Sequence, residues 1–295
     1  MKEIVIVSGK GGTGKTSITA SFAYLGGQDI ILADCDVDAA DMHLLMQPDF
    51  ATAEDFYSGQ LARINPESCT NCGACADVCR FDAITVLEGH YTIDAINCEG
   101  CGYCPRVCPE KAISMIEQKV GQRYISHTKT GSPMVHARLG IAAESSGKLV
   151  TKVKTEARAL AQAQHKKFVL VDGSPGVGCP VISSLSGAHF IVLVTEPTVS
   201  GFHDLKRVYE LVRSFNLRAG CIINKSDLNP QITDDILAYL QETGIFHIGS
   251  LTYDESFTKA MVNGLTLPEY TNGSLTKPLK HSWKTIMAYV SNSGD

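Results

Sequence analysis

Two groups of residues in this chain have the types and the spacing that chemistry requires. One is a glycine-rich loop near the N-terminus, Gly9-Lys10-Gly11-Gly12-Thr13-Gly14-Lys15-Thr16. Its glycines allow backbone N–H groups to turn inward around phosphates. The other group is eight cysteines in two tight runs: Cys69, Cys72, Cys75 and Cys79, then Cys98, Cys101, Cys104 and Cys108. Runs of this kind indicate metal ligation rather than disulfides.

The glycine-rich loop satisfies the pattern G-x-x-x-x-G-K-[ST], which binds the phosphates of a nucleoside triphosphate. We expect Lys15 to reach the β- and γ-phosphates and the hydroxyl of Thr16 to ligate Mg²⁺. Ser17 completes the predicted phosphate-binding residues. Asp172 ends an apolar strand, which is the place of an outer or water-bridged carboxylate ligand of Mg²⁺.

Each cysteine run reads C-x₂-C-x₂-C-x₃-C, the spacing of bacterial ferredoxins. Three cysteines at this spacing bind one [4Fe–4S] cluster, and the fourth binds the other cluster. We therefore predict two clusters with crossed ligands: Cys69, Cys72, Cys75 and Cys108 for the first, and Cys98, Cys101, Cys104 and Cys79 for the second. Zinc is the alternative metal, but zinc sites usually show two C-x₂-C pairs that lie further apart.

The elements that must position the phosphate loop form a βαβ pattern. A short β-branched run at 4–8 precedes the loop, a helix is predicted from 15 to 25, and a second strand follows at 30–33. Strand–helix alternation returns after residue 118. The carboxyl ends of parallel strands meet at one edge of a sheet, so we expect the ligand there.

The cysteine-rich stretch interrupts this pattern as an insert. Residues 63–117 are rich in turns and carry eight acidic against four basic residues. We predict an α/β fold, with a mostly parallel P-loop sheet flanked by helices, formed by residues 1–60 and 118–295. Residues 61–117 form a small inserted ferredoxin-like α+β module with two clusters.

Composition limits the classes of function. The chain has 295 residues, of which 44% are hydrophobic, enough for one large domain and a small module. A net charge of −5 argues against a general nucleic-acid binder. The N-terminus lacks the layout of a signal peptide, and no apolar run reaches the ~20 residues of a spanning helix. We expect a cytoplasmic protein in a reducing compartment, without stable membrane insertion.

Lys10 adds a family resemblance to these motifs. The sequence Lys-Gly-Gly-x-Gly-Lys-Thr resembles the deviant Walker A loop of the superfamily of MinD, ParA, Mrp and the nitrogenase iron protein, a SIMIBI-type fold. The resemblance implies an ATPase that works as a homodimer, or as a heterodimer with a paralogous ATPase. It implies that Lys10 crosses the dimer interface and stabilises charge on the partner's nucleotide. Asp36 is expected to position the attacking water, and Asp41 is the alternative for that role or for helping to hold Mg²⁺.

Two further segments resemble the same superfamily. The stretch from Asp172 to Gly178 resembles switch II, which senses the γ-phosphate. The loop Asn224-Lys225-Ser226-Asp227 resembles a base-recognition loop, so Asn224, Lys225 and Asp227 join the predicted nucleotide site. We expect ATP, with GTP as the alternative. Cys179 occupies the offset of a dimer-bridging cluster ligand, but residues 120–171 hold no second cysteine, so no bridging cluster is expected.

The resemblance covers nearly the whole chain and implies three functions. The leading hypothesis is that ATP binding and hydrolysis change the conformation of a dimer, and that this change is coupled to electron transfer through the two clusters to a redox partner protein. One alternative is a carrier or maturation ATPase that hands iron–sulfur clusters to an acceptor protein. The other is a redox-sensing binding switch of the MinD or ParA kind.

Overall fold

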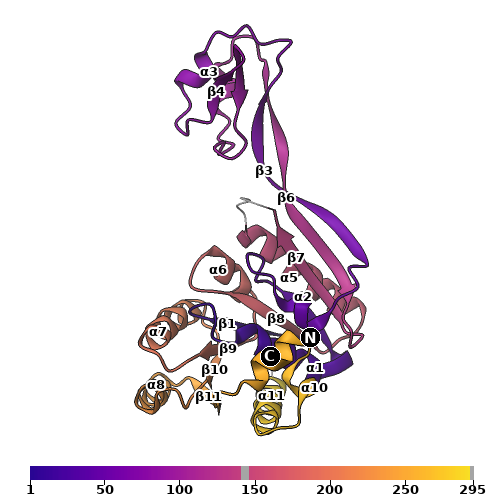
Figure 1. Ribbon diagram of the computed structural model, residues 1–295, viewed down its shortest axis with the longest axis vertical. Helices are drawn as coiled ribbons and strands as arrows, with labels where there is room; N and C mark the ends of the chain where they lie inside the picture. The colour runs from indigo at the N-terminus through magenta and orange to yellow at the C-terminus, as the bar shows by residue number, and fades with distance from the viewer. Residues whose placement is uncertain (141–145, 293–295) are drawn as a thin grey trace. The chain divides into compact units, whose positions relative to one another are not determined.

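The computed structural model describes residues 1–140 and 146–292 (Figure 1). The chain divides into two compact units. The first comprises Met1–Glu54, Gln122–Arg138 and the chain from Ser146 onward, and the second consists mainly of Asp55–Gly121. The predicted insert boundaries at residues 61 and 117 fall within β3 (Thr52–Ile64) and β6 (Ile113–His127), the strands along which the chain passes between the units.

A sheet with the strand order β11-β10-β9-β1-β8-β2-β7-β6-β3 organises the fold. Neighbouring strands from β11 to β7 pair in parallel. The bounds of these strands are β1 Lys2–Ser8, β2 Ile30–Asp34, β7 Pro133–Leu139, β8 Phe168–Pro175, β9 Phe190–Thr195, β10 Ala219–Asn224 and β11 Phe246–Leu251. The predicted mostly parallel α/β sheet is thus confirmed.

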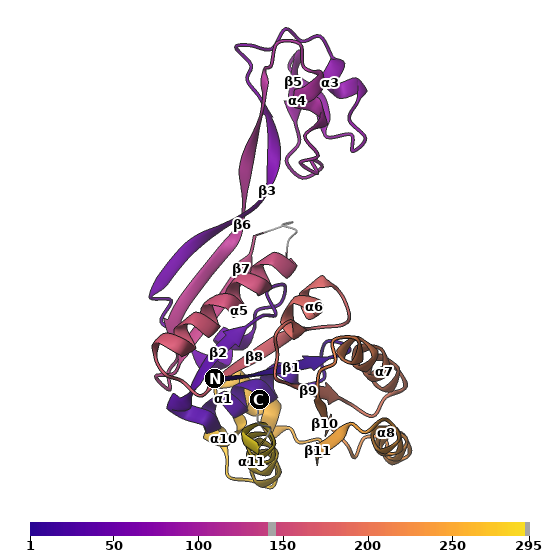
Figure 2. The ribbon, with the colours of Figure 1, turned by 180° about the vertical axis from the view of Figure 1, so that it is seen from behind.

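Helices flank this sheet. Figures 1 and 2 show α1 and α11 on one side of the sheet and α5 and α6 on the other. The helices of the first unit are α1 Lys15–Gly26, α2 Met42–Met46, α5 Ser146–Ala163, α6 Cys179–Leu185, α7 Val199–Ser214, α8 Pro230–Thr243, α9 Ser256–Val262, α10 Leu267–Tyr270 and α11 Thr276–Asn292. Helices α7 and α8 begin at side-chain caps: Thr198 accepts from the N–H of Gly201, and Asn229 from that of Ile232.

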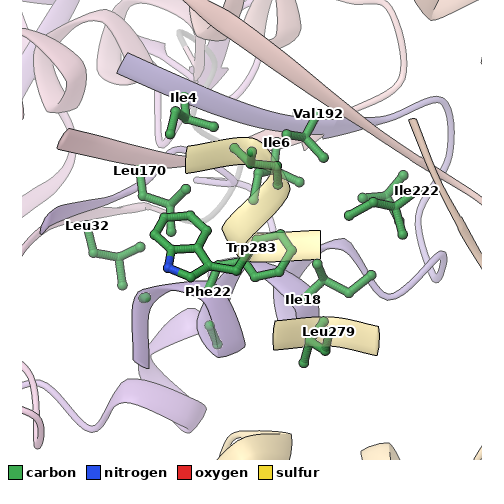
Figure 3. Close-up of a cluster of buried hydrophobic side chains, with 14 of the residues drawn as sticks. Ile4, Ile6, Ile18, Phe22, Leu32, Leu170, Val192, Ile222, Leu279 and Trp283 are labelled. Atoms are coloured by element: carbon green, nitrogen blue, oxygen red, sulfur yellow. The ribbon is translucent and has the colours of Figure 1, made fainter. Parts of the chain in front are cut away.

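Both faces of the central strands are buried, as parallel strands require. Ile4 and Ile6 point to the side of α1 and α11, where Figure 3 shows them near Phe22 and Trp283. The rings of Phe22 and Trp283 stack with centroids 5.3 Å apart. The alternate residue Val5 is equally buried and belongs to the opposite face. The central strands are therefore held between two layers of helices.

The second unit contains short elements around the cysteine runs. They are α3 Ala74–Asp77, β4 Ile84–Leu87, β5 His90–Ile93 and α4 Tyr103–Val107. Strands β4 and β5 form an antiparallel hairpin. Its buried cluster is small: Ala62, Cys75 and Ile113, with partly buried cysteines packed against them. Partly buried aliphatic side chains, among them Ile64, Ile84 and Ile93, also pack against this cluster.

Replacement of Trp283 by alanine tests the core between α11 and the sheet. Trp283 is 7% exposed and stacks on Phe22, so Trp283→Ala should lower the free energy of unfolding by about 3–5 kcal/mol. Chemical denaturation monitored by circular dichroism measures the change. Tyr253→Ala, at a residue that is 51% exposed, should change the free energy by about 0.5 kcal/mol or less. Equal effects of the two variants would contradict the assignment of Trp283 to the core.

Candidate functional site

The glycine-rich loop joins β1 to α1 at the carboxyl edge of the sheet. Gly12 and Gly14 have φ angles of 79° and 88°, a left-handed conformation that favours glycine. A Cβ on Gly14 would lie 2.4 Å from Nδ2 of Asn224. The same Nδ2 donates to the backbone oxygen of Thr13 at 2.8 Å. Glycine torsions therefore shape the loop, and Asn224 holds it to the end of β10.

Lys15, at the start of α1, is buried among carboxylates. Its Nζ lies 2.9 Å from Oδ1 of Asp172 and 3.3 Å from Oδ2 of Asp36. Burial alone would lower the pKa of Lys15, but Asp172 and Asp36 outweigh burial and raise the pKa above its ordinary value. Thr16 Oγ1 and Thr19 Oγ1 donate to the two carboxylate oxygens of Asp172, at 2.8 and 2.9 Å. Asp172 thus ties β8 to the first turn of α1.

A third carboxylate, that of Asp34, completes an acidic cluster at this edge. Asp34 lies opposite Asp172 in the register of β2 and β8. Burial, followed by the charge of Asp172, raises the pKa of Asp34 well above its ordinary value. Three carboxyl groups, those of Asp34, Asp36 and Asp172, thus share one ammonium, and their mutual repulsion opposes the charged form of Asp34. A divalent cation would remove the excess negative charge.

Two buried oxygen atoms support a ligand at this place. Asp34 Oδ2 and Thr13 Oγ1 have no hydrogen-bond partner within residues 1–140 and 146–292. Buried polar atoms in proteins are almost always paired, so these two are suited to meet a ligand. Oxygen atoms are the ligands that Mg²⁺ prefers. The site therefore fits Mg²⁺ beside Thr16 and Asp172. Asp34 is an additional carboxylate, which belongs to the acidic stretch 34–41 that resembles switch I but was not among the predicted Mg²⁺ ligands.

The two candidates for the water-positioning carboxylate differ in their surroundings. Asp36 is 8% exposed and pairs with Lys15. Asp41 is exposed at the residue before α2. Burial, partly offset by Lys15, raises the pKa of Asp36. The placement favours Asp36 for a role at the phosphates, and the role itself stays a prediction.

The predicted base-recognition loop divides between two contacts. Lys225 has a φ of 54°, and its Nζ donates to the backbone oxygen of Gly12 at 3.2 Å. Oδ1 of Asp227 instead accepts from the backbone N–H of Tyr253 at 2.6 Å, beyond the end of β11. Asn224 and Lys225 thus contact the phosphate loop. Asp227 instead links the loop after β10 to the segment after β11.

Lys10 pairs with a carboxylate other than those around Lys15. Its Nζ forms an ion pair with Glu196, at 2.7 Å, just after β9. Glu196 is a second residue that our reading of the sequence did not select as a site residue, because only the parallel pairing of β1 and β9 brings it to the loop.

Ser17, the last of the predicted phosphate-binding residues, lies in the first turn of α1. Its backbone oxygen accepts a hydrogen bond from the hydroxyl of Ser21 at 2.7 Å.

Each predicted set of four cysteines lines a pocket of its own in the second unit. The first pocket is lined by Cys69, Cys72, Cys75 and Cys108. The second is lined by Cys79, Cys98, Cys101 and Cys104. The pockets hold about 340 and 380 Å³ of space free of protein atoms, part of it open to solvent. In both, the fourth cysteine comes from the other run, as the crossed-ligand prediction requires.

The two cysteine runs share a backbone pattern. Gly73 and Gly102, each directly after the second cysteine of its run, have φ angles of 81° and 69°. Each is the left-handed residue directly before a short helix, α3 or α4, and each lines one of the two pockets. Burial raises the pKa of Cys104 to about 11, so iron would have to displace a proton from this thiol.

The distances within the pockets do not suit a single ion. In the described part of the chain, no three histidine, cysteine, aspartate or glutamate side chains come close enough together to bind one metal ion. The four thiolates of a cubane bind four different irons, so they stand further apart than the ligands of one ion. The lining fits [4Fe–4S] clusters, which remain a prediction.

Among the helices of residues 1–140 and 146–292, none has the combination of length and hydrophobicity that a membrane-spanning helix requires.

The site consists of a strand, a glycine-rich loop and a helix, and a carboxylate from the neighbouring parallel strand pairs with the lysine of the loop. This arrangement defines a P-loop nucleotide-binding protein. Residues 4–267 match the family described as "CobQ/CobB/MinD/ParA nucleotide binding domain". The chain therefore belongs to this family, and the resemblance to MinD and ParA is confirmed.

Relatives and solved structures agree with this membership. An uncharacterised protein of Methanocaldococcus jannaschii is 33% identical over 290 residues, which is 98% of this chain and 97% of the relative. A second uncharacterised protein of that organism is 25% identical over 231 residues, 76% of this chain and 81% of the relative. The fold is similar to the cell division ATPase MinD of Pyrococcus furiosus, with a TM-score of 0.58, 16% identity, and 98% and 99% of the two chains covered. MinD from Pyrococcus horikoshii, solved with Mg-ADP, gives a TM-score of 0.57 at 16% identity, with 99% of each chain covered.

Two glycines of the loop offer a matched pair of variants. Gly14→Ala places a Cβ in contact with Asn224 at a left-handed φ, so it should lower the thermal midpoint of the nucleotide-free protein and weaken nucleotide binding. A Cβ on Gly11 would meet no atom within 4 Å, so Gly11→Ala should leave the midpoint unchanged. Differential scanning fluorimetry compares the variants. The geometry described for the loop is wrong if Gly14→Ala is as stable as Gly11→Ala.

Proposed function

We propose that this protein is an ATP-hydrolysing dimer that couples nucleotide-driven conformational change to electron transfer through two [4Fe–4S] clusters to a partner protein. The observation that carries the proposal is the lining of two pockets by the two crossed sets of cysteines, in one chain with a MinD/ParA-type nucleotide site. The chemistry that the clusters supply, when bound, is one-electron transfer. The partner is a redox protein.

The nucleotide half of the proposal rests on the phosphate loop. We propose that residues 9–17 hold the phosphates of ATP or ADP, that Lys15 and Lys10 balance phosphate charge, and that Thr16 and Asp172 hold Mg²⁺. Asp36, beside Lys15, positions the attacking water. The MinD structure of P. horikoshii with Mg-ADP supports adenine nucleotide and Mg²⁺ as the ligands. The dimer is a homodimer or a heterodimer with a paralogous ATPase.

The coupling needs a free-energy difference between two states. ATP can promote electron transfer only if the nucleotide-bound state binds the partner better, or has a different cluster potential, than the nucleotide-free state. Asp172 belongs both to the Mg²⁺ site and to the segment that resembles switch II. Release of Asp172 from Lys15 and Thr16 is a physical event by which a nucleotide would move that segment.

The test compares one protein in three nucleotide states. Protein isolated without oxygen should contain about eight irons per chain, and redox titration by EPR should give cluster potentials that differ between MgATP, MgADP and no nucleotide. Cytochrome c serves as an artificial acceptor protein. The rate at which it is reduced should also differ between the three nucleotide states, and should be highest in the state with the lowest cluster potential. Lys15→Ala is the control: it should keep the iron and lose the nucleotide effect. Equal potentials and equal rates in all three states would exclude ATP-driven electron transfer.

The same preparation distinguishes the two other candidate functions. Movement of radiolabelled iron from the protein to an apo-ferredoxin, without net electron flow, would identify a carrier or maturation factor instead. A change of ATPase rate on reduction, again without electron flow to cytochrome c, would identify a redox-sensing switch. The crossed ligands weigh against cluster donation, because loss of one cluster leaves three cysteines of one run and one cysteine of the other without iron.

Cysteine substitutions test the crossed ligand sets directly. Cys79→Ala should reduce the iron content from about eight to about four per chain by loss of the second cluster. The EPR spectrum of the remaining cluster should match that of Cys101→Ala and differ from that of Cys72→Ala, although Cys79 belongs to the run of Cys72. Cys179→Ala, at an exposed cysteine outside the module, should keep about eight irons. A match of Cys79→Ala with Cys72→Ala would show uncrossed ligation.

A further inference from the structure

The carboxylate of Glu196 lies between two loops of the nucleotide site. Glu196 follows β9 and precedes α7, and it is 9% exposed. One oxygen, Oε1, lies 2.7 Å from Nζ of Lys10 in the phosphate loop. The other, Oε2, lies 2.8 Å from Nζ of Lys225 in the loop after β10. One carboxylate therefore pairs with two lysines that come from different loops.

The ammonium of Lys10 is fully engaged at this position. Besides Glu196, it donates to Oγ1 of Thr198 at 3.1 Å and to Oγ of Ser200 at 3.0 Å. An ammonium has three N–H donors, and three acceptors surround this one. Thr198 is the N-cap of α7. Lys10 is thus bound to the start of α7, with no donor left for a phosphate.

Lys225 forms the other half of the bridge. Its Nζ also donates to the backbone oxygen of Gly12, so Lys225 contacts the phosphate loop and Glu196 at once. Burial would raise the pKa of Glu196, but the hydrogen bonds from Lys10 and Lys225 outweigh burial and lower the pKa. Glu196 therefore carries its negative charge across the physiological pH range, next to a loop built to accept phosphate anions.

These contacts imply a competition for one cation. A bound triphosphate attracts Lys10, and Lys10 can reach it, in its own loop or across a dimer interface, only by leaving Glu196, Thr198 and Ser200. Lys225 can stay on Glu196 during this exchange, because it uses the other carboxylate oxygen. The carboxylate that Lys10 leaves then keeps one cationic partner, which lowers the cost of the exchange relative to an isolated buried charge.

We propose that Glu196 is a positioning residue that holds Lys10 on α7 in the nucleotide-free protein and releases it when MgATP enters the loop. This inference rests on the proposed nucleotide function and adds to it an internal competitor of the triphosphate. It predicts that neutralising Glu196 tightens MgATP binding, although the substitution removes two ion pairs.

The test uses Glu196→Gln, which keeps the shape and a hydrogen-bond acceptor, in the whole protein. The variant should bind MgATP roughly tenfold more tightly by isothermal titration calorimetry, the range of one charge-assisted hydrogen bond. Glu210→Gln, at an exposed residue of α7, should bind as the wild type does. The gain should disappear in the Lys10→Met background, since the two residues act as one pair.

A second measurement follows Lys10 itself. Acetylation by an N-hydroxysuccinimide ester, quantified at Lys10 by mass spectrometry without nucleotide, should be several-fold faster in Glu196→Gln than in the wild type and in Glu210→Gln. Slower or unchanged acetylation would overturn the hold on Lys10. Two outcomes would overturn the competition alone, provided that the wild type binds MgATP. One is that Glu196→Gln binds MgATP no more tightly than the wild type. The other is that Glu196→Gln gives the same gain in affinity in the Lys10→Met background. Failure of the wild type to bind MgATP would overturn the release step together with the proposed nucleotide function.

Discussion

The ion pair between Lys15 and Asp172 is the interaction on which the nucleotide site depends. It joins the first residue of α1 to β8, and Thr16 and Thr19 add hydrogen bonds to the same carboxylate. A buried lysine requires a partner of this kind, because an unpaired buried charge is strongly unfavourable. The pair thereby fixes the glycine-rich loop, which lies between β1 and α1, over the carboxyl edge of the sheet.

The balance of charge around that pair explains why the site suits a nucleotide with Mg²⁺. Asp34, Asp36 and Asp172 surround one lysine, while Lys10 and Lys225 share Glu196 on the other side of the loop. Both lysines of the loop are thus paired with protein carboxylates in the nucleotide-free chain. A bound phosphate would pair with Lys10 and Lys15 in place of the protein carboxylates. A bound cation would pair with the carboxylates in place of the lysines. Nucleotide and Mg²⁺ together exchange one set of ion pairs for another, and do not add charge to a neutral surface.

A different constraint shapes the cysteine module. Each pocket receives three cysteines from one run and one from the other, so neither run completes a pocket by itself. The buried cluster of the unit is small and consists partly of the cysteines themselves. Under the proposed function, folding of this unit and assembly of the iron–sulfur clusters would depend on each other. The two runs differ in the residue after their fourth cysteine, because Arg80 follows Cys79 whereas Pro109 follows Cys108.

Local features of the sequence determined the α/β elements, the phosphate loop and the four-cysteine spacing. β-branched runs, glycines at fixed offsets and C-x₂-C steps act over a few residues, so they can be recognised without knowledge of the fold. The tertiary structure decided the rest: Asp34 lies opposite Asp172, Asn224 holds Thr13, and Glu196 pairs with Lys10. It also separated Asp36, which is buried beside Lys15, from Asp41, which is exposed. These contacts join residues that are mostly more than a hundred positions apart, and the register of parallel strands, which no local pattern encodes, brings them together.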